Sequence, residues 1–137
     1  MKQACDGERK ALDEQIRRHG IDVIAWAYSD DPWAPMQDWD LMLADPHDGE
    51  FLLRLASDPL CPKRGFFLHC LYILVGDYVR VLCAGVRTPV ALDGLLKAAE
   101  ANENPTIGTW LHRSRNLIAH PETFDYDFWC NGGFART

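Results

Sequence analysis

The sequence predicts an all-α fold, or nearly so: a single domain built as a bundle of four or five helices. The first observation is an apolar stretch at about 65–84, hydrophobic on most sides, which is typical of the central helix of a bundle. The second is a pair of helix starts, Thr88-Pro89 and Asn104-Pro105, each with a capping residue before a proline. The third is the composition of the 137 residues, 47% hydrophobic and 25% charged, which is typical of one globular domain.

The first part of the chain is predicted to hold short elements around an irregular acidic segment. Residues 7–19 have the charged pattern of a solvent-facing helix, which Gly20 ends. Residues 21–28 are β-branched and aromatic, and they fit either a short strand or a turn of buried helix. Segment 30–50 carries two tryptophans and six aspartates. This composition fits a surface connection pinned by its aromatic side chains, and also a lid or partner-binding segment.

Four helices are predicted from residue 48 onward, at about 48–57, 65–84, 90–101 and 105–120. The last two should form a hairpin, because only a short polar connection separates them. The aromatic tail 122–137 is expected to pack back across the bundle in extended form. A short strand or hairpin near 21–28 or 125–134 is the one β element that the pattern allows.

One polar stripe runs along the apolar helix, at steps of three or four residues: His69, Tyr72, Gly76 and Arg80, with Asp77 beside them. One interpretation is a polar seam in which Asp77 and Arg80 form an ion pair across one helical turn. The other is a binding surface, in which Asp77 holds Arg113 or Arg115 in place and Arg80 adds positive charge for a phosphate.

The strongest chemical signal is the stretch 113–120 (RSRNLIAH), which Pro121 follows. It places arginines, which are always charged, close to a histidine that titrates near neutral pH, and this combination suits phosphate chemistry. Pro121 disfavours helical geometry at His120, so the helix is expected to end there. In an unbroken helix Arg115 and His120 would point about 140° apart, whereas Arg113 would share the face of His120.

Residues 115–120 (RNLIAH) resemble the R-x4-6-H motif of the HEPN superfamily, the higher eukaryotes and prokaryotes nucleotide-binding domains. The helical setting and the proline after the motif are similar as well, and the resemblance covers about residues 62–121. Arg113 fits the same spacing rule. Arg115 is preferred as the motif arginine because a polar residue, often asparagine, follows that arginine in the family.

The resemblance implies a helical domain that forms a homodimer with the two motifs facing each other. It also implies a metal-independent endoribonuclease of a toxin–antitoxin, CRISPR-associated or phage-defence system, although other members are inactive binding modules. In a nuclease, His120 would transfer the proton, Arg115 would bind the phosphate through two hydrogen bonds and Asn116 would orient either group. Neither a metal nor another cofactor is expected.

The net charge of −6 argues against broad RNA binding through a basic face and is compatible with a small basic pocket. It also supports a second hypothesis, a catalytically inactive immunity protein or antitoxin that binds a basic, co-encoded protein partner. A third hypothesis is a small-ligand binder that uses the same arginine and histidine.

Localisation is predicted from the cysteines and from the apolar segments. The five cysteines are odd in number and widely spaced, which favours a reduced, cytoplasmic setting. No apolar leader is visible at the N-terminus, and the longest apolar run, Gly65–Gly76, is too short to span a bilayer.

Overall fold

The computed structural model describes residues 22–31, 39–84 and 92–136, and all regular structure within them is helical. The all-α prediction is therefore confirmed. The elements are α2 (Val23–Ala27), α3 (Trp39–Leu43), η1 (Pro46–Asp48), α4 (Gly49–Ser57), α5 (Arg64–Ala84), α6 (Asp93–Glu100), α7 (Pro105–Ala119), η2 (Pro121–Thr123), α8 (Tyr126–Cys130) and η3 (Gly133–Arg136). The helix expected at 7–19 and the helix start expected at Thr88-Pro89 lie outside the described residues.

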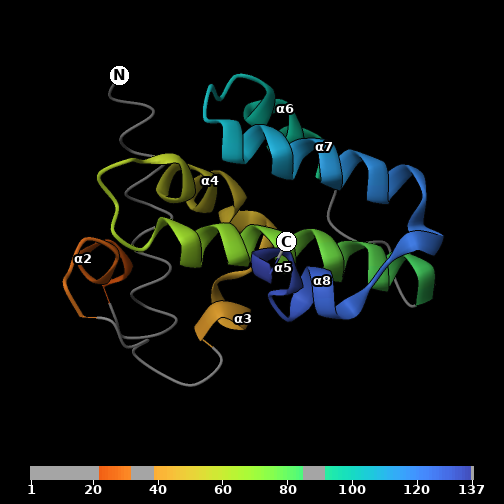
Figure 1. The fold of residues 1–137 in the computed structure, drawn as a ribbon, viewed down its shortest axis with the longest axis horizontal. Coiled ribbons are helices and arrows are strands. Elements are labelled where there is room, and N and C mark those ends of the chain that lie inside the picture. Colours follow the sequence, from red (N-terminus) through yellow and green to blue (C-terminus); the bar gives the residue numbers. More distant parts are fainter. Residues whose placement is uncertain (1–21, 32–38, 85–91, 137) are drawn as a thin grey trace.

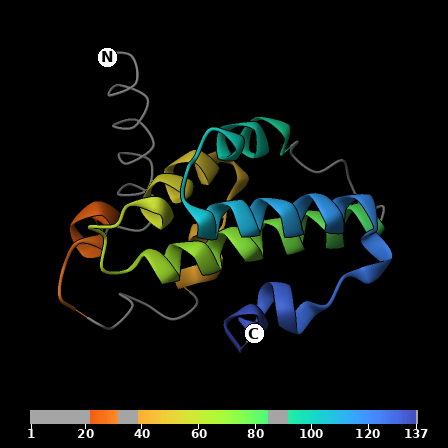
Figure 2. The same ribbon diagram turned by 45° about the horizontal axis from the view of Figure 1, so that its top comes forward.

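Helix α5 is the centre of the bundle, as its apolar sequence predicts. In Figures 1 and 2 it crosses the middle of the molecule with α7 alongside it, and it also contacts α3, α4 and α8. Its neighbours cover most of its sides, because burying a large apolar side chain contributes about 1.5–3 kcal/mol. The largest fully buried side chains come from several helices: Trp39, Leu43, Leu52, Phe67, Leu71, Tyr72 and Trp110.

Helix α7 begins and ends where the sequence predicts. The side chain of Asn104 accepts a hydrogen bond from the backbone N–H of Thr106 at 2.9 Å, and Pro105 is the first helical residue. The helix ends before His120, whose φ of −131° and ψ of 67° lie outside the helical range. Pro121 therefore stops the helix at the histidine, as its effect on the preceding residue requires.

Residues 23–27 form a short helix, α2, which settles the choice between strand and helix in favour of the helix. Asp22 caps its start by accepting from the backbone N–H of Ala25 at 3.0 Å. At its other end, Nζ of Lys63 donates to the carbonyl oxygens of Trp26 and Ser29, each at 2.7 Å. The lysine thus adds a charged donor to the carbonyl groups at the C-terminal end of the helix.

The tail returns to the bundle as predicted, but the expected extended form is wrong. Residues 126–130 form α8, which Asp125 caps by accepting from the backbone N–H of Asp127 at 3.1 Å. Trp129 of α8 is buried against α5, next to Gly76. A Cβ at Gly76 would lie 2.7 Å from Cβ of Trp129, so the glycine permits a close approach of the two helices.

The last residues fold over α5 through a tight turn. Gly132 has a φ of +74°, a conformation that glycine adopts without strain. The turn brings Phe134 against Tyr72, with ring centroids 3.9 Å apart and the planes 8° from parallel. In both ribbon views the C-terminal end consequently lies beside the middle of α5.

In the described part of the chain, one helical stretch, Arg64–Leu82, is long and apolar enough to cross a membrane by length and composition. It is longer than the apolar run seen in the sequence. Half of it is buried inside the domain, a location that is compatible with the core helix of a soluble protein.

Tyr28 joins α2 to the residue that ends α4. Its hydroxyl donates to Oδ2 of Asp58, and the other carboxylate oxygen accepts from the backbone N–H of Leu60 at 2.9 Å. The bond to Asp58 raises the pKa of Tyr28 to about 12. The same bond lowers the pKa of Asp58, with a further contribution from the Leu60 N–H.

Replacing Gly76 by alanine is expected to lower the free energy of unfolding by about 1–3 kcal/mol, because the added methyl group overpacks the contact between α5 and α8. Gly108→Ala on α7 is the matched control, since no atom of the described residues lies within 4 Å of the Cβ that it adds. That change should raise the free energy of unfolding by about 0.5–1 kcal/mol through helix propensity. Urea denaturation measures both, and a stabilising effect of Gly76→Ala would contradict the close approach.

The lowered pKa of Asp58 predicts a loss of stability in acid. The contribution is present above the unfolded pKa, about 3.9, and disappears as the pH falls through the folded value. Tyr28→Phe should raise the pKa of Asp58 toward its ordinary value and flatten the decline of unfolding free energy below about pH 4. An NMR titration of the Asp58 carboxyl and urea denaturation at several pH values test this. Tyr126→Phe, at another exposed tyrosine, is the control and should follow the parent curve.

Candidate functional site

Arg115 and His120 do not meet within one chain. Arg115 points toward α6, where it forms a salt bridge with Glu100, and its side chain is 49% exposed. The His120 side chain is 60% exposed at the end of α7, with Nδ1 3.7 Å from a carboxylate oxygen of Glu122. Each of these two motif residues thus has an acidic neighbour of its own, so one protomer offers no shared Arg115–His120 site.

Arg113 points toward α5 and α8 and is partly buried between them. Its Nη1 donates to the Tyr72 hydroxyl at 3.0 Å, and its guanidinium carbon lies 5.4 Å from the centre of the Phe128 ring. Arg80 and Arg115 form salt bridges with carboxylates, whereas no carboxylate of the described residues lies within salt-bridge distance of Arg113. A partly buried charge of this kind favours an anionic ligand.

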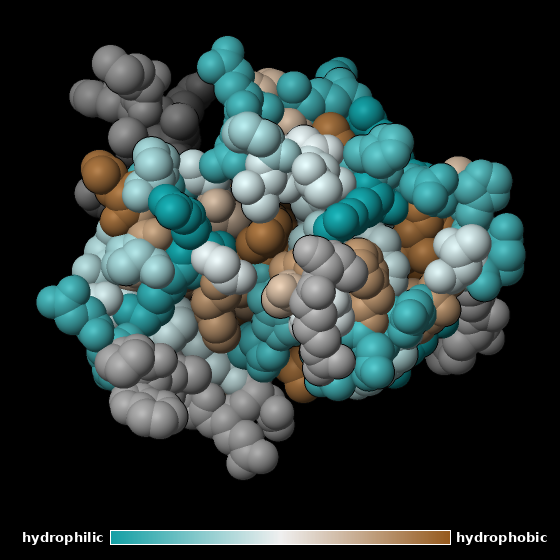
Figure 3. Space-filling view, in the orientation of Figure 1, coloured by the Kyte–Doolittle hydropathy of each residue, from teal (hydrophilic) through white to brown (hydrophobic). Residues whose placement is uncertain are grey.

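The larger of two hollows beside Arg113 is a groove between α5, α7 and the C-terminal turn, with a volume of about 690 Å³. Figure 3 shows hydrophobic residues exposed between the α5 and α7 positions of Figure 1, next to the C-terminal end. Its lining residues are Gly65, Leu68, His69, Tyr72, Pro105, Thr106, Thr109, Arg113, Gly132, Phe134 and Ala135. We call this hollow the apolar groove, and its size is typical of small-molecule sites.

The smaller hollow, about 240 Å³, lies on the other side of Arg113 at the junction of α7 and α8. It is lined by Arg113, Asn116, Leu117, Thr123, Asp125, Phe128 and Trp129, and we call it the polar pocket. Asn116 therefore lies at the same site as Arg113, the other candidate for the motif arginine. His120 does not line the polar pocket, but its carbonyl accepts from the Thr123 hydroxyl at 2.7 Å.

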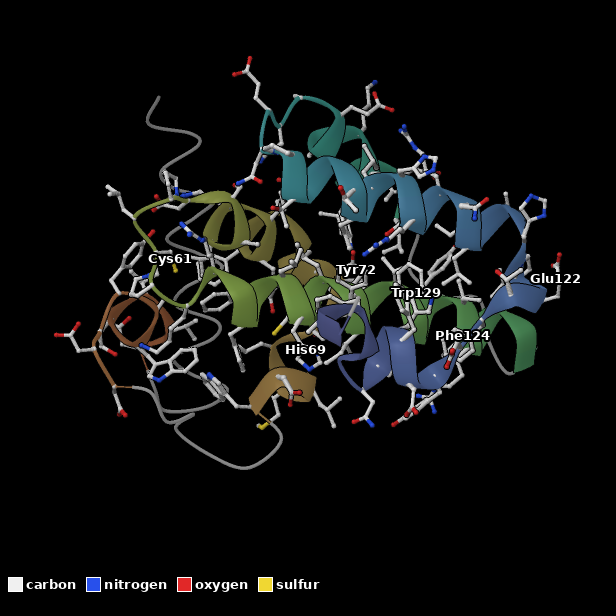
Figure 4. All side chains as sticks on the ribbon, in the orientation of Figure 1. Cys61, His69, Tyr72, Glu122, Phe124 and Trp129 are labelled. Carbon is white, nitrogen blue, oxygen red and sulfur yellow. The ribbon has the colours of Figure 1, made fainter. Side chains whose placement is uncertain are left out.

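The polar stripe of α5 divides into two parts with different surroundings. Asp77 and Arg80 form the ion pair that the first interpretation of the stripe predicts. Asp77 makes no hydrogen bond or ion pair with Arg113 or Arg115. The other part, His69 and Tyr72, lines the apolar groove, and Figure 4 shows both side chains leaving α5.

His69 is held from two sides. Its Nε2 lies 2.9 Å from Oδ2 of Asp40 on α3, and its ring stacks on Phe134 with centroids 6.0 Å apart. An ionised Asp40 can only accept a hydrogen bond, so Nε2 of His69 must then be the donor. The other ring nitrogen, Nδ1, takes no part in this bond. Asp40 belongs to the acidic segment 30–50, so in its described part this segment supports a groove residue.

The sequence pattern predicts one face of α7 but not the part that the tail plays in the two hollows. Helical phase predicts a common face for Thr109, Arg113, Asn116 and His120. The first three line one hollow or the other, whereas His120 lines neither. Phe128 and Phe134, which complete the two hollows, follow no periodic pattern that connects them to α7. Only their aromatic character suggested that the tail would pack back.

The described cysteines do not form a nucleophilic or metal-binding site. Cys61 and Cys70 are buried free thiols, and burial raises the pKa of both. Thiols in such surroundings are poor nucleophiles, because the thiolate is the reactive form. No group of three or more potential metal ligands occurs among the residues that the structure describes.

Comparison with other proteins adds no functional information. No protein-family model, no curated protein and no solved structure matches this chain. Function is therefore inferred from the residues of the site and their geometry.

Double-mutant cycles should rank the two arginine contacts. The coupling between Arg113→Met and Tyr72→Phe is expected to be about 1 kcal/mol, because the Tyr72 hydroxyl is almost fully buried. The coupling between Arg115→Met and Glu100→Gln should stay below about 0.5 kcal/mol, since exposed ion pairs are screened by solvent. Urea denaturation of the single and double variants measures both couplings. A larger coupling for the exposed pair would mean that Arg115 is the structurally held arginine.

Proposed function

We propose that this chain is a HEPN-like helical domain that binds RNA with Arg113, rather than Arg115, as its phosphate-binding arginine. The observation that supports this proposal concerns Arg113, which lines the polar pocket together with Asn116. Arg113 has no carboxylate partner among the described residues. Arg115 is neutralised by Glu100. Both arginines fit the spacing of the motif, so choosing Arg113 in place of Arg115 keeps the match to R-x4-6-H.

The geometry of α7 favours RNA binding by a single protomer and RNA cleavage by a homodimer. Arg113 and His120 are seven residues apart, which corresponds to about 10 Å along a helix axis. In the observed arrangement Arg113 lines both hollows and His120 lines neither, so the two side chains of one protomer do not face a common site. A homodimer that places His120 of one copy near Arg113 of the other would supply the proton transfer and the positive charge that RNA cleavage needs.

The acidity of the chain limits the expected RNA contact to a short stretch. Asp125 lines the polar pocket together with Arg113, and it would repel further phosphates. Binding should therefore depend weakly on salt, with a slope corresponding to one or two neutralised phosphates. A cytoplasmic location is part of the proposal, because Cys61, Cys70 and Cys130 are free thiols.

Fluorescence anisotropy with labelled single-stranded RNA in EDTA tests the proposal. Arg113→Met is expected to weaken binding at least tenfold, because it removes the charge near the phosphate. Arg115→Met, the matched control on the same helix, should change binding less than threefold. His120→Ala should abolish cleavage and leave binding intact. A larger effect of Arg115→Met, or no RNA binding by the parent chain, would overturn the proposal.

A second candidate function follows from the acidic residues around the motif. Glu100 neutralises Arg115, Glu122 lies beside His120 and Asp125 lines the polar pocket. This arrangement suits a catalytically inactive module that binds a basic protein, such as an immunity protein or antitoxin. Failure to bind RNA, together with tight association with a co-encoded basic protein, would support this alternative.

A further inference from the structure

The apolar groove has the form of a ligand site with one charged end. Its walls come from three elements distant in sequence: the first half of α5, the first half of α7 and the C-terminal turn. Leu68, Pro105, Phe134 and Ala135 supply apolar surface, and the guanidinium of Arg113 supplies positive charge. A mostly apolar hollow with a few convergent polar groups is the usual form of a small-molecule site.

At the charged end of the groove, Tyr72 and Arg113 have more hydrogen-bond donors than acceptors to receive them among the described residues. Tyr72 is 2% exposed, and its hydroxyl accepts from Arg113 but donates to no acceptor among the described residues. Arg113 uses one N–H for this bond and has others left, since a guanidinium carries five. A buried O–H beside an arginine that has no carboxylate partner in the described part of the chain forms a donor pair, which an anion with two acceptor oxygens would satisfy.

The two neighbours of this donor pair hold it in place. The face of Phe128 lies against the guanidinium of Arg113, and Phe134 is stacked on the ring of Tyr72. Both side chains therefore have fixed orientations before any ligand binds. Sites arranged in advance lose less conformational entropy on binding.

We propose that the apolar groove binds a small carboxylic acid with an aromatic or aliphatic body. Its carboxylate would accept hydrogen bonds from Arg113 and Tyr72, and its body would lie along Leu68, Pro105 and Phe134. A carboxylate fits better than a phosphate, because one guanidinium balances a single negative charge and the adjoining walls are apolar. The inference does not require RNA binding, although both sites use Arg113.

Titrations of the full chain with 4-phenylbutyrate and with decanoate, followed by two-dimensional NMR, test this inference. The primary amide of 4-phenylbutyrate is the uncharged reference and should bind at least tenfold more weakly than the acid. Arg113→Met should weaken binding of the acid at least tenfold, and Tyr72→Phe should weaken it severalfold. Arg115→Met, whose side chain lies outside the groove, should leave it unchanged.

Two further variants separate this inference from the RNA proposal. Ala135→Trp fills the exposed wall of the apolar groove and should block the acid while sparing RNA, whereas Asn116→Ala in the polar pocket should do the reverse. The inference is overturned if neither carboxylate binds, if the amide binds as tightly as the acid, or if Arg113→Met and Arg115→Met have equal effects. The two-dimensional NMR spectrum of each variant shows whether its helical bundle is still folded.

Discussion

The need to bury α5 sets the arrangement of the other helices. A helix that is apolar on most sides cannot be covered by one neighbour, so α3, α4, α7 and α8 all pack against it. Gly76 allows α8 to come close, and Gly132 then turns the chain so that Phe134 reaches Tyr72. The hollows beside Arg113 exist because the tail returns to α5 next to α7.

The different surroundings of the two arginines follow from this packing. Successive faces of α7 meet different neighbours, because α6 lies on one side of the helix and α5 with α8 on the other. Arg115 therefore meets Glu100, while Arg113 meets the Tyr72 hydroxyl and the Phe128 ring. One arginine is paired with a carboxylate at the surface, and the other is partly desolvated and has no carboxylate partner among the described residues.

Arg113 also connects the two proposed sites, since it lines both hollows. An anion held by Arg113 and Tyr72 in the apolar groove would compete with an RNA phosphate in the polar pocket for the same guanidinium. Such competition is a coupling free energy between ligands, and it would lower both affinities by the same factor. A carboxylic acid in the groove would then act as an inhibitor of RNA binding.

The sequence is sufficient to predict the all-α class, the central helix, the capped start of α7 at Asn104 and its end at His120. These features depend on local preferences and on hydrophobic pattern, which are properties of neighbouring residues. It also identified the face of α7 that carries Arg113 and Asn116. Which arginine lacks a carboxylate partner among the described residues depends on the tertiary structure, since Glu100, Tyr72 and Phe128 belong to other helices. The tertiary structure also decided that the tail is helical and completes two hollows, because Gly76 and Trp129 meet only when α5 and α8 pack together.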